Sequence, residues 1–204
     1  MLIEMLKIEL VANEYRHRVF EIYENCRLKL TAKNINQWNT SYPSLELIED
    51  DILNSNLYAL YLNKEILGII CINTIQEKEY KGINWKDLSN SNLVIHRLAV
   101  DPRHQGKSYA HTLMDFAESY ALKNGFSSIR LDAYSANLTA LNFYTKRGYT
   151  KRGEVFFYGR HLPFYCYEKK KKKLTLKTII NICQSEAINE RSLSVHHFYK
   201  AGSL

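Results

Sequence analysis

A short loop between a strand pattern and a helical pattern carries residue types that suit phosphate binding. An apolar run ends at Val100, and the residues QGKSYA at positions 105–110 lead directly into helical periodicity. Gly106, Ser108 and Ala110 place a small residue at every second position. Free N–H groups at a helix start attract an anion, and small side chains let a bulky anion reach them. The loop predicts a diphosphate cradle, with an ordinary strand-to-helix turn as an equally supported interpretation.

Two cations, Arg103 and Lys107, would add positive charge to such a cradle. The loop is not a P-loop, because G-x-x-x-x-G-K-[ST] is absent, and it is not a dinucleotide fingerprint, because G-x-G-x-x-G is absent. His96 in the preceding apolar run is a candidate for proton transfer, since the imidazole pKa is ordinarily about 6.5. Strand alternation predicts that His96 shares a face with Leu98 and that Arg97 points the other way.

The elements that must position these residues follow from hydrophobic periodicity and turn signals. Asn92–Val100 is a nearly continuous apolar run, which is typical of a central strand. A strand–helix–strand–helix–strand order in the middle of the chain predicts an α/β sheet with parallel neighbours. We expect strands at residues 5–11, 57–62, 66–75, 92–100, 127–132, 154–158 and 162–168, and helices at 13–30, 45–53, 109–123 and 137–147.

Composition sets the broad class of the protein. The 204 residues are 46% hydrophobic and 24% charged, which is ordinary for a globular domain. The net charge of +7 comes mainly from the run Lys169–Lys173, without which it is +2, so the charge argues only weakly for nucleic acid. The four cysteines form no C-x-x-C pair, and no apolar run is long enough to cross a membrane. A reduced, cytoplasmic protein without a bound metal is the expectation.

Two motifs resemble those of the GNAT family of acyl-CoA-dependent N-acetyltransferases. The family signature Q/R-x-x-G-x-G/A is matched by residues 105–110, after an Ala-Val-Asp-Pro sequence at 99–102. A second match joins Asn137, Ala140 and Tyr144 to the Gly-aromatic pair at 148–149. The resemblance covers residues 1–168. The loop INQW…YPS at 35–44 and the strand VIHRLAV at 94–100 also resemble a bacterial branch of the family.

The signature differs from the family at one position. Ser108 stands where the first glycine is expected, and serine is small and keeps its N–H, so the cradle is preserved. A positive φ at Ser108 is less expected for that reason.

The resemblance implies a fold and a cosubstrate. The fold would be a GNAT-type mixed α/β structure, with a mostly antiparallel sheet, a central parallel strand pair, flanking helices and a C-terminal tail. The cosubstrate would be acetyl-CoA, whose pantetheine pairs with the strand at Leu98, Ala99 and Val100. Its pyrophosphate would rest on the backbone amides of Gln105, Gly106, Lys107, Ser108, Tyr109 and Ala110.

The resemblance also implies acetyl transfer by direct attack of an amine in a ternary complex. Tyr144 is the expected proton donor to the departing thiolate, although its periodicity alone favours a core position. Asn137 would contact the cosubstrate and could also cap a helix. Asp132 is the first candidate for the general base, with a turn cap as an equal alternative. His96 is the second candidate, because a lone histidine in a central strand is more often structural.

The acceptor would be a primary amine of a small molecule or a peptide. Trp38 and Tyr42 in a Pro- and Asn-rich loop are candidates for the wall of its pocket, and they could equally be a cover over the core. Two alternative functions are also considered. One is an acyl-CoA-binding sensor of the same fold without catalysis. The other is a nucleic-acid-binding protein built around Lys169–Lys173, which has no aromatic–basic pattern to support it. Neither nucleic acid nor membrane is an expected partner.

Residues 169–204 are expected to form a basic C-terminal extension outside the acetyltransferase domain of residues 1–168. Apolar residues recur there at helical spacing from Leu176 to Ala187, which predicts a short amphipathic helix. Such a helix must bury its apolar stripe, and a homodimer is one arrangement that would do so.

Overall fold

The computed structural model describes residues 6–170, which belong to the first of the two units into which the chain divides, Met1–Lys171 and Lys172–Leu204. The helix predicted from Leu176 to Ala187 lies outside the described residues. The strands are β1 (Leu6–Leu10), β2 (Leu57–Leu62), β3 (Glu65–Asn73), β4 (Asn92–Ile95), β5 (Ala99–Val100), β6 (Ser128–Tyr134), β7 (Thr150–Val155) and β8 (Phe164–Lys170). The α-helices are α1 (Arg16–Thr31), α2 (Leu45–Leu53), α3 (Tyr109–Lys123) and α4 (Leu138–Lys146).

The strands form one mixed sheet in the order β1-β2-β3-β4-β6-β8-β7, with β5 pairing to β3 beside this path. β4 and β6 are the parallel pair, in which Leu93 lies opposite Ile129, and the other pairs are antiparallel. This mostly antiparallel sheet with a central parallel pair confirms the predicted fold class.

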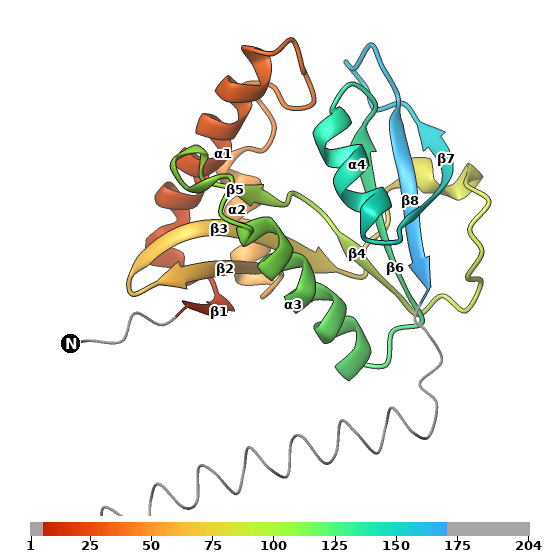
Figure 1. Ribbon diagram of the computed structural model, residues 1–204, viewed down its shortest axis with the longest axis horizontal. Coiled ribbons are helices and arrows are strands. Elements are labelled where there is room, and N and C mark those ends of the chain that lie inside the picture. Colours follow the sequence, from red (N-terminus) through yellow and green to blue (C-terminus); the bar gives the residue numbers. More distant parts are fainter. Residues whose placement is uncertain (1–5, 171–204) are drawn as a thin grey trace, which may run out of the picture. The chain divides into compact units, whose positions relative to one another are not determined.

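Helices cover both faces of the β1–β5 half of the sheet (Figure 1). α3 buries Leu113, Met114 and Ala117 in a cluster with side chains of β3, β4 and β6. α1 and α2 bury Val19, Ile22 and Ile48 in a second cluster on the other face. The predicted 45–53 helix is confirmed, with the same first and last residues. The Ser44 hydroxyl caps its start by accepting a 3.2 Å hydrogen bond from the Leu47 N–H.

The strand expected to run without a break from Asn92 to Val100 is interrupted, which corrects the sequence analysis. β4 ends at Ile95, and β5 begins at Ala99. β4 pairs with β6, whereas β5 pairs only with β3 among the described strands. Figure 1 shows β5 leading away from β6 after the interruption. The sheet therefore opens between β5 and β6.

Gly68 explains how β5 can lie so close to β3. It is paired with Val100, and a Cβ built on it would lie 2.9 Å from the Ala99 carbonyl oxygen and 3.1 Å from Leu113 Cδ1. Only a residue without a side chain fits this contact between β3, β5 and α3.

Several other predicted boundaries differ from the structure, including those of the strands expected at 66–75 and 162–168, which are β3 and β8. The helix expected from residue 13 starts as a 3₁₀ turn at Asn13–Tyr15, and α1 follows it. The strand expected at 154–158 is β7, Thr150–Val155, whose side chains are mostly exposed or half-buried. A strand at the edge of a sheet need not show apolar alternation, so periodicity placed it several residues too late.

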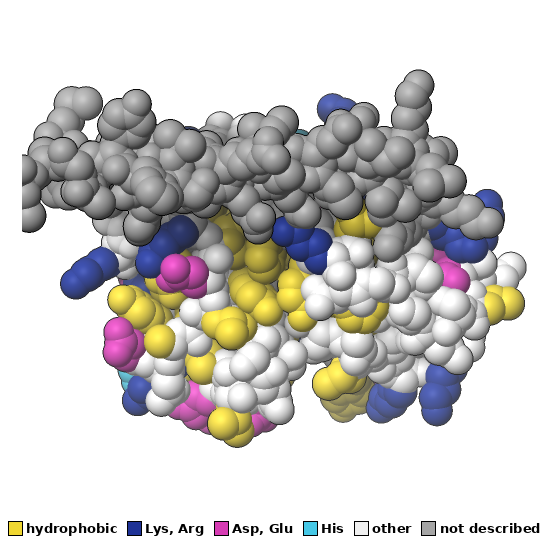
Figure 2. All heavy atoms as spheres, turned by 90° about the horizontal axis from the view of Figure 1, so that it is seen from below, with side chains coloured by type: hydrophobic (Ala, Val, Ile, Leu, Met, Phe, Trp, Pro, Cys, Tyr) yellow, Lys and Arg dark blue, Asp and Glu magenta, His cyan; other side chains and the backbone are white. Residues whose placement is uncertain are grey.

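The described surface mixes the two signs of charge. Figure 2 shows Lys and Arg side chains in separate groups, with Asp or Glu side chains beside several of them. None of the helices in residues 6–170 has the length and apolar character needed to cross a bilayer.

Candidate functional site

Two adjoining cavities lie where the sheet opens. The loop cavity, of about 570 Å³, is lined by β5, the 104–111 segment and the C-terminal part of α1. The charged cavity, of about 440 Å³, is lined by the 95–98 interruption, the end of β6 and the loop after β7. Both volumes are within the usual range of small-molecule sites. The residues that line both cavities are Gln37, Trp38, Leu98, Asn137, Ala140 and Tyr144.

The predicted cradle lines the loop cavity. Gln105, Gly106, Ser108, Tyr109 and Ala110 all lie on its wall. Among the described residues, no acceptor forms a hydrogen bond with the N–H of Gly106 or of Ser108. A Cβ built on Gly106 would meet no protein atom within 4 Å. The loop therefore presents free backbone donors and open space, as a bulky anion requires.

The conformation of Ser108 corrects an expectation. Its φ is +63°, in the left-handed region, where serine was less expected than glycine. Gly106 also has a positive φ, of +83°. Ser108 therefore adopts, at some conformational cost, a backbone conformation that glycine takes freely.

Asp101 anchors the start of the loop. It is fully buried, it caps the 3₁₀ turn by accepting a 3.0 Å hydrogen bond from the Arg103 N–H, and it forms ion pairs with Arg18 and Arg103. These bonds hold the pKa of Asp101 below its ordinary value. The Gln105 side chain adds a second tie, because its Nε2 donates a 3.0 Å hydrogen bond to the Val100 carbonyl.

The cations near the cradle are not the expected pair. Arg103 is held by Asp101 and Glu65, and neither Arg103 nor the Lys107 side chain is among the residues that line the loop cavity. Lys29 and Lys33 at the end of α1 line it instead, and Lys29 Nζ lies 2.6 Å from Gln105 Oε1. Sequence distance hid these two lysines, because they are more than seventy residues from the loop.

Leu98, Ala99 and Val100 form the strand side of the loop cavity. The edge of β5 that faces away from β3 has no strand partner among the described residues. The Val100 carbonyl already accepts hydrogen bonds from Gln105 Nε2 and Cys26 Sγ. The predicted pairing of an extended ligand with Leu98 and Val100 stays a prediction.

Tyr144 lies at the junction of the two cavities. It is 8% exposed, and its hydroxyl makes no hydrogen bond to another described residue. Burial, followed by the charge of Asp132, raises the pKa of Tyr144 above its ordinary value. The phenol therefore stays protonated at neutral pH and can donate its hydrogen.

Asn137 fulfils the structural role considered for it. Its Oδ1 caps α4 by accepting a 3.1 Å hydrogen bond from the Ala140 N–H. Its Nδ2 donates a 2.9 Å hydrogen bond to Gln37 Oε1, which ties α4 to the loop that carries Trp38. Asn137 also lines both cavities, so contact with a ligand remains open to it.

Asp132 lines the charged cavity near Tyr144. Its Oδ2 accepts a 2.6 Å hydrogen bond from the Tyr80 hydroxyl, so it is not the turn cap considered as its alternative. Burial raises the pKa of Asp132 to about 6, while the bond from Tyr80 opposes that increase. A carboxylate with such a pKa is suited to general base work near neutral pH.

His96 also lines the charged cavity, with one ring nitrogen already bonded. Its Nε2 lies 2.9 Å from Asn73 Oδ1, and burial together with the Arg97 charge lowers the pKa of His96 to about 4. The ring is therefore neutral at pH 7 and a weak base, which favours Asp132 for that role.

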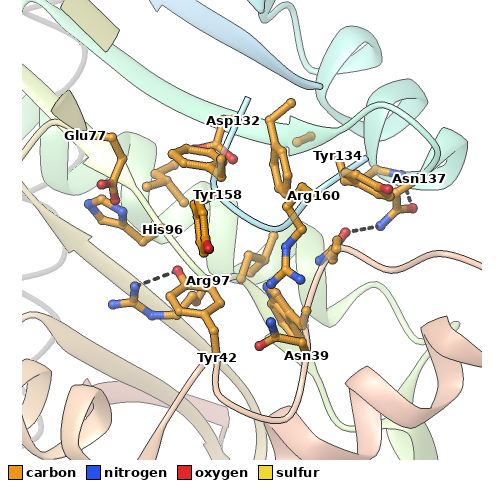
Figure 3. A pocket seen from close by; sticks show the side chains of 18 of the residues that line it. Asn39, Tyr42, Glu77, His96, Arg97, Asp132, Tyr134, Asn137, Tyr158 and Arg160 are labelled. Carbon is orange, nitrogen blue, oxygen red and sulfur yellow. Dashed lines mark hydrogen bonds between the residues drawn. The ribbon is translucent and has the colours of Figure 1, made fainter. Parts of the chain in front are cut away.

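Arg97 and His96 line the same cavity, so the prediction that their side chains point in opposite directions is wrong. The chain is not in a strand at 96–98, and both side chains line the charged cavity. Arg97 forms a buried ion pair with Asp51 and donates a 3.1 Å hydrogen bond to the Tyr42 hydroxyl. Figure 3 shows this bond beneath the pocket.

Trp38 and Tyr42 line the charged cavity, where the sequence analysis placed the acceptor. Trp38 is also packed edge-on against Tyr23 at 5.4 Å, so it serves the core as well. Sequence reasoning missed several polar residues of this cavity, among them Glu77, Tyr158 and Arg160. They come from irregular loops, where periodicity gives no signal for side-chain direction.

Comparisons with known proteins agree with this geometry. Residues 16–149 match the model of the Acetyltransferase (GNAT) family. The chain is 28% identical over 142 residues to streptothricin acetyltransferase of Escherichia coli, covering 69% of this chain and 72% of that protein. A GNAT-family acetyltransferase from Streptococcus agalactiae has the same fold, with a TM-score of 0.71 and 22% identity over 82% of this chain and 96% of that one.

A further solved structure with this fold is PaiA N-acetyltransferase of Thermoplasma acidophilum in complex with coenzyme A. Its TM-score is 0.63, at 18% identity over 82% of this chain and 99% of that one. The motifs, the opened sheet and the family match together establish that this chain belongs to the GNAT acetyltransferase family.

Proposed function

We propose that this acetyltransferase uses acetyl-CoA and transfers its acetyl group to a primary amine by direct attack in a ternary complex. The observation that carries the proposal is the meeting of the two cavities at Leu98 and Tyr144. A thioester reaching the junction through the loop cavity would meet an amine held in the charged cavity.

The loop cavity suits the cosubstrate. The N–H groups of Gly106 and Ser108 have no acceptor among the described residues, a Cβ on Gly106 would meet no atom within 4 Å, and Lys29 and Lys33 line the same cavity. The unpaired edge of β5 suits the amides of a pantetheine arm. A protein with the same fold was solved in complex with coenzyme A, which supports coenzyme A as the kind of ligand.

Acetyl-CoA would supply the activated carbonyl and a thiolate leaving group. Asp132 would take a proton from the acceptor ammonium, directly or through water, so that the nitrogen lone pair is free to attack. A backbone N–H near Leu98 would polarise the carbonyl, and the Tyr144 hydroxyl would give its proton to sulfur as the C–S bond breaks and the C–N bond forms.

The relatives suggest the kind of acceptor only in general terms. Streptothricin acetyltransferase is named for the acetylation of streptothricin, and we carry over from it only the acetyl transfer. The sensor alternative keeps the loop cavity but leaves Asp132 and Tyr144 without a role.

The test is release of free thiol from acetyl-CoA with a panel of primary amines, with coenzyme A binding measured by calorimetry on the same sample. Thiol release that depends on the amine, and an acetylated product seen by mass spectrometry, are expected. Binding of coenzyme A without turnover of any amine would support the sensor instead.

A further inference from the structure

We propose that the acceptor amine also carries an anionic group, and that Arg160 binds this group while the amine lies beside Asp132. The acceptor class is therefore a small amino acid-like zwitterion. This inference rests on the proposed N-acetyltransferase function and extends it to the substrate.

The charges of the charged cavity are not all compensated within the protein. Arg97 is compensated, because Asp51 pairs with it and Tyr42 accepts a hydrogen bond from it. Arg160 also lines the cavity, is half-buried, and its guanidinium forms no ion pair or hydrogen bond with another described residue. A guanidinium has five N–H donors in a planar fork, which suits a carboxylate.

Two carboxylates in the same cavity form no ion pair among the described residues, although the charge of Arg97 acts on both of them. Asp132 receives a hydrogen bond from the neutral Tyr80 hydroxyl, and the structure gives it no ion pair within residues 6–170. Glu77 is half-buried, lines the cavity, and has no ion pair among the described residues either. A cationic amine would compensate this side of the cavity.

The place where the acetyl group is transferred decides which end of the acceptor lies beside Asp132 and which end lies beside Arg160. The charge of Asp132 acts on the Tyr144 hydroxyl, so Asp132 lies on the side of the cosubstrate junction. The acceptor nitrogen must reach that side. Figure 3 shows the Arg160 side chain extending from the loop after β7 toward Asn39, away from Asp132. The anionic group of the acceptor would therefore be the end remote from the reacting nitrogen.

A purely cationic acceptor fits the cavity less well. A diamine with one nitrogen beside Asp132 would bring its second cation toward Arg160, and like charges repel in a partly desolvated site. Glu77 could hold a second cation only by leaving Arg160 without an anion. A zwitterion compensates both signs at once.

Matched acceptors test the inference. γ-Aminobutyrate, δ-aminovalerate and L-lysine would each be compared with their own carboxamide, which keeps the amine and removes only the anion. Hydrogen bonds between charged groups are worth enough for a preference of roughly ten-fold or more in kcat/KM for the carboxylate. At least one carboxylate should show that preference in the natural protein.

Two variants assign the preference to Arg160. Arg160→Met should bring the carboxylate-to-carboxamide ratio of kcat/KM close to one, and Arg160→Lys should retain part of it. The KM for acetyl-CoA should not change in either. Lys146→Met removes an exposed cation that lines neither cavity and should keep the full ratio.

Failure of this inference differs from failure of the proposed function. Turnover with carboxamides equal to or better than carboxylates, or a preference that survives Arg160→Met, would overturn the zwitterion while leaving the acetyltransferase intact. If no amine is turned over, calorimetric titration of the same ligands into the protein with coenzyme A decides. Carboxylate binding lost in Arg160→Met would support the site, and equal binding of acid and amide would reject it.

Discussion

The Tyr80 hydroxyl donates a 2.6 Å hydrogen bond to Oδ2 of Asp132, and Tyr80 itself is only 2% exposed. This bond and burial act on the Asp132 pKa in opposite directions. Burial disfavours the carboxylate and raises the pKa, whereas the hydroxyl stabilises the carboxylate and lowers it, with a result of about 6. Tyr80 therefore sets the pH at which the proposed base becomes active.

Replacing Tyr80 by Phe should move the acidic limb of the pH–rate profile to higher pH. The reason is that the carboxylate loses its donor, so the pKa of Asp132 rises above about 6. The rate at alkaline pH should stay near that of the natural protein, since the base is ionised there in both. The profile of kcat/KM against pH is the measurement. Asp132→Asn is the reference variant and should lower the rate by ~10²-fold or more above the Asp132 pKa of about 6, where the carboxylate of the natural protein is ionised. An unmoved limb in Tyr80→Phe would show that another group titrates.

Asp132 should also make the fold less stable as pH rises. Its pKa is higher in the folded chain, at about 6, than in an unfolded chain, at about 3.9. Protons are then bound more tightly by the folded state, so its stability falls between those two values and stays lower above them. A difference of about two pKa units corresponds to ~3 kcal/mol. Denaturant unfolding at pH 5 and at pH 8, compared with Asp132→Asn, should show a gain for the variant that is larger at pH 8. A gain that does not grow with pH would contradict the raised pKa.

Tyr144→Phe should lower kcat by ~10²-fold with little change in either KM. The hydroxyl has no partner among the described residues, so its removal leaves no buried group unpaired, and the ring remains packed. An interaction made only in the transition state appears in kcat. Single-turnover thiol release is the measurement, and Tyr149→Phe, which lines neither cavity, is the matched control. Thiol release at the natural rate in Tyr144→Phe would show that Tyr144 has only a structural role.

Acetyl-CoA affinity should depend on the main chain of the loop more than on its side chains. Ser108→Gly should leave affinity nearly unchanged, because glycine adopts the same positive φ. Ala110→Glu should abolish binding, because it fills the cradle and places a negative charge against the diphosphate. Calorimetry with both variants is the test, and equal affinities would reject the cradle.

Gly68→Ala should weaken both stability and acetyl-CoA binding. The new methyl group would meet the Ala99 carbonyl oxygen at 2.9 Å, so β5 must move away from β3. Overpacking of this kind typically costs ~1–3 kcal/mol. Gly82→Ala is the control, because a Cβ there meets nothing within 4 Å. Denaturant unfolding and calorimetry should separate the two variants. Unchanged cosubstrate affinity in Gly68→Ala would show that the position of β5 is not critical.

The sequence predicted the local elements well because their signals are local. Ser44 and Asn137 cap the helices that follow them, as their types suggest, and the 45–53 and 109–123 helices have the expected bounds. The interruption at 96–98 left no such signal. His96 and Arg97 looked like polar positions in a strand, whereas the structure ends β4 at Ile95 and pairs β5, which begins at Ala99, with β3.

Part of the lining of the two cavities was predictable, in the motifs and also at Trp38, Tyr42, His96 and Asp132. Residues 105–110, Asn137 and Tyr144 were found because their spacing is local. Lys29 and Arg160 were missed because long-range folding brings them to the cavities, and neither stands in a pattern. The Asp132 pKa depends on Tyr80, 52 residues away, so no sequence rule could supply it.

The interruption at 96–98 has a consequence for association between chains. An unpaired strand edge is a template on which another chain can add a strand, which is the usual route to edge-to-edge aggregation. β5 is two residues long, Ala99–Val100, and the 3₁₀ turn that starts at Pro102 closes it on one side. That is too short to align a strand of ordinary length, which has five or six residues. An edge of this length can be left open for a slender ligand with one or two amides without inviting polymerisation.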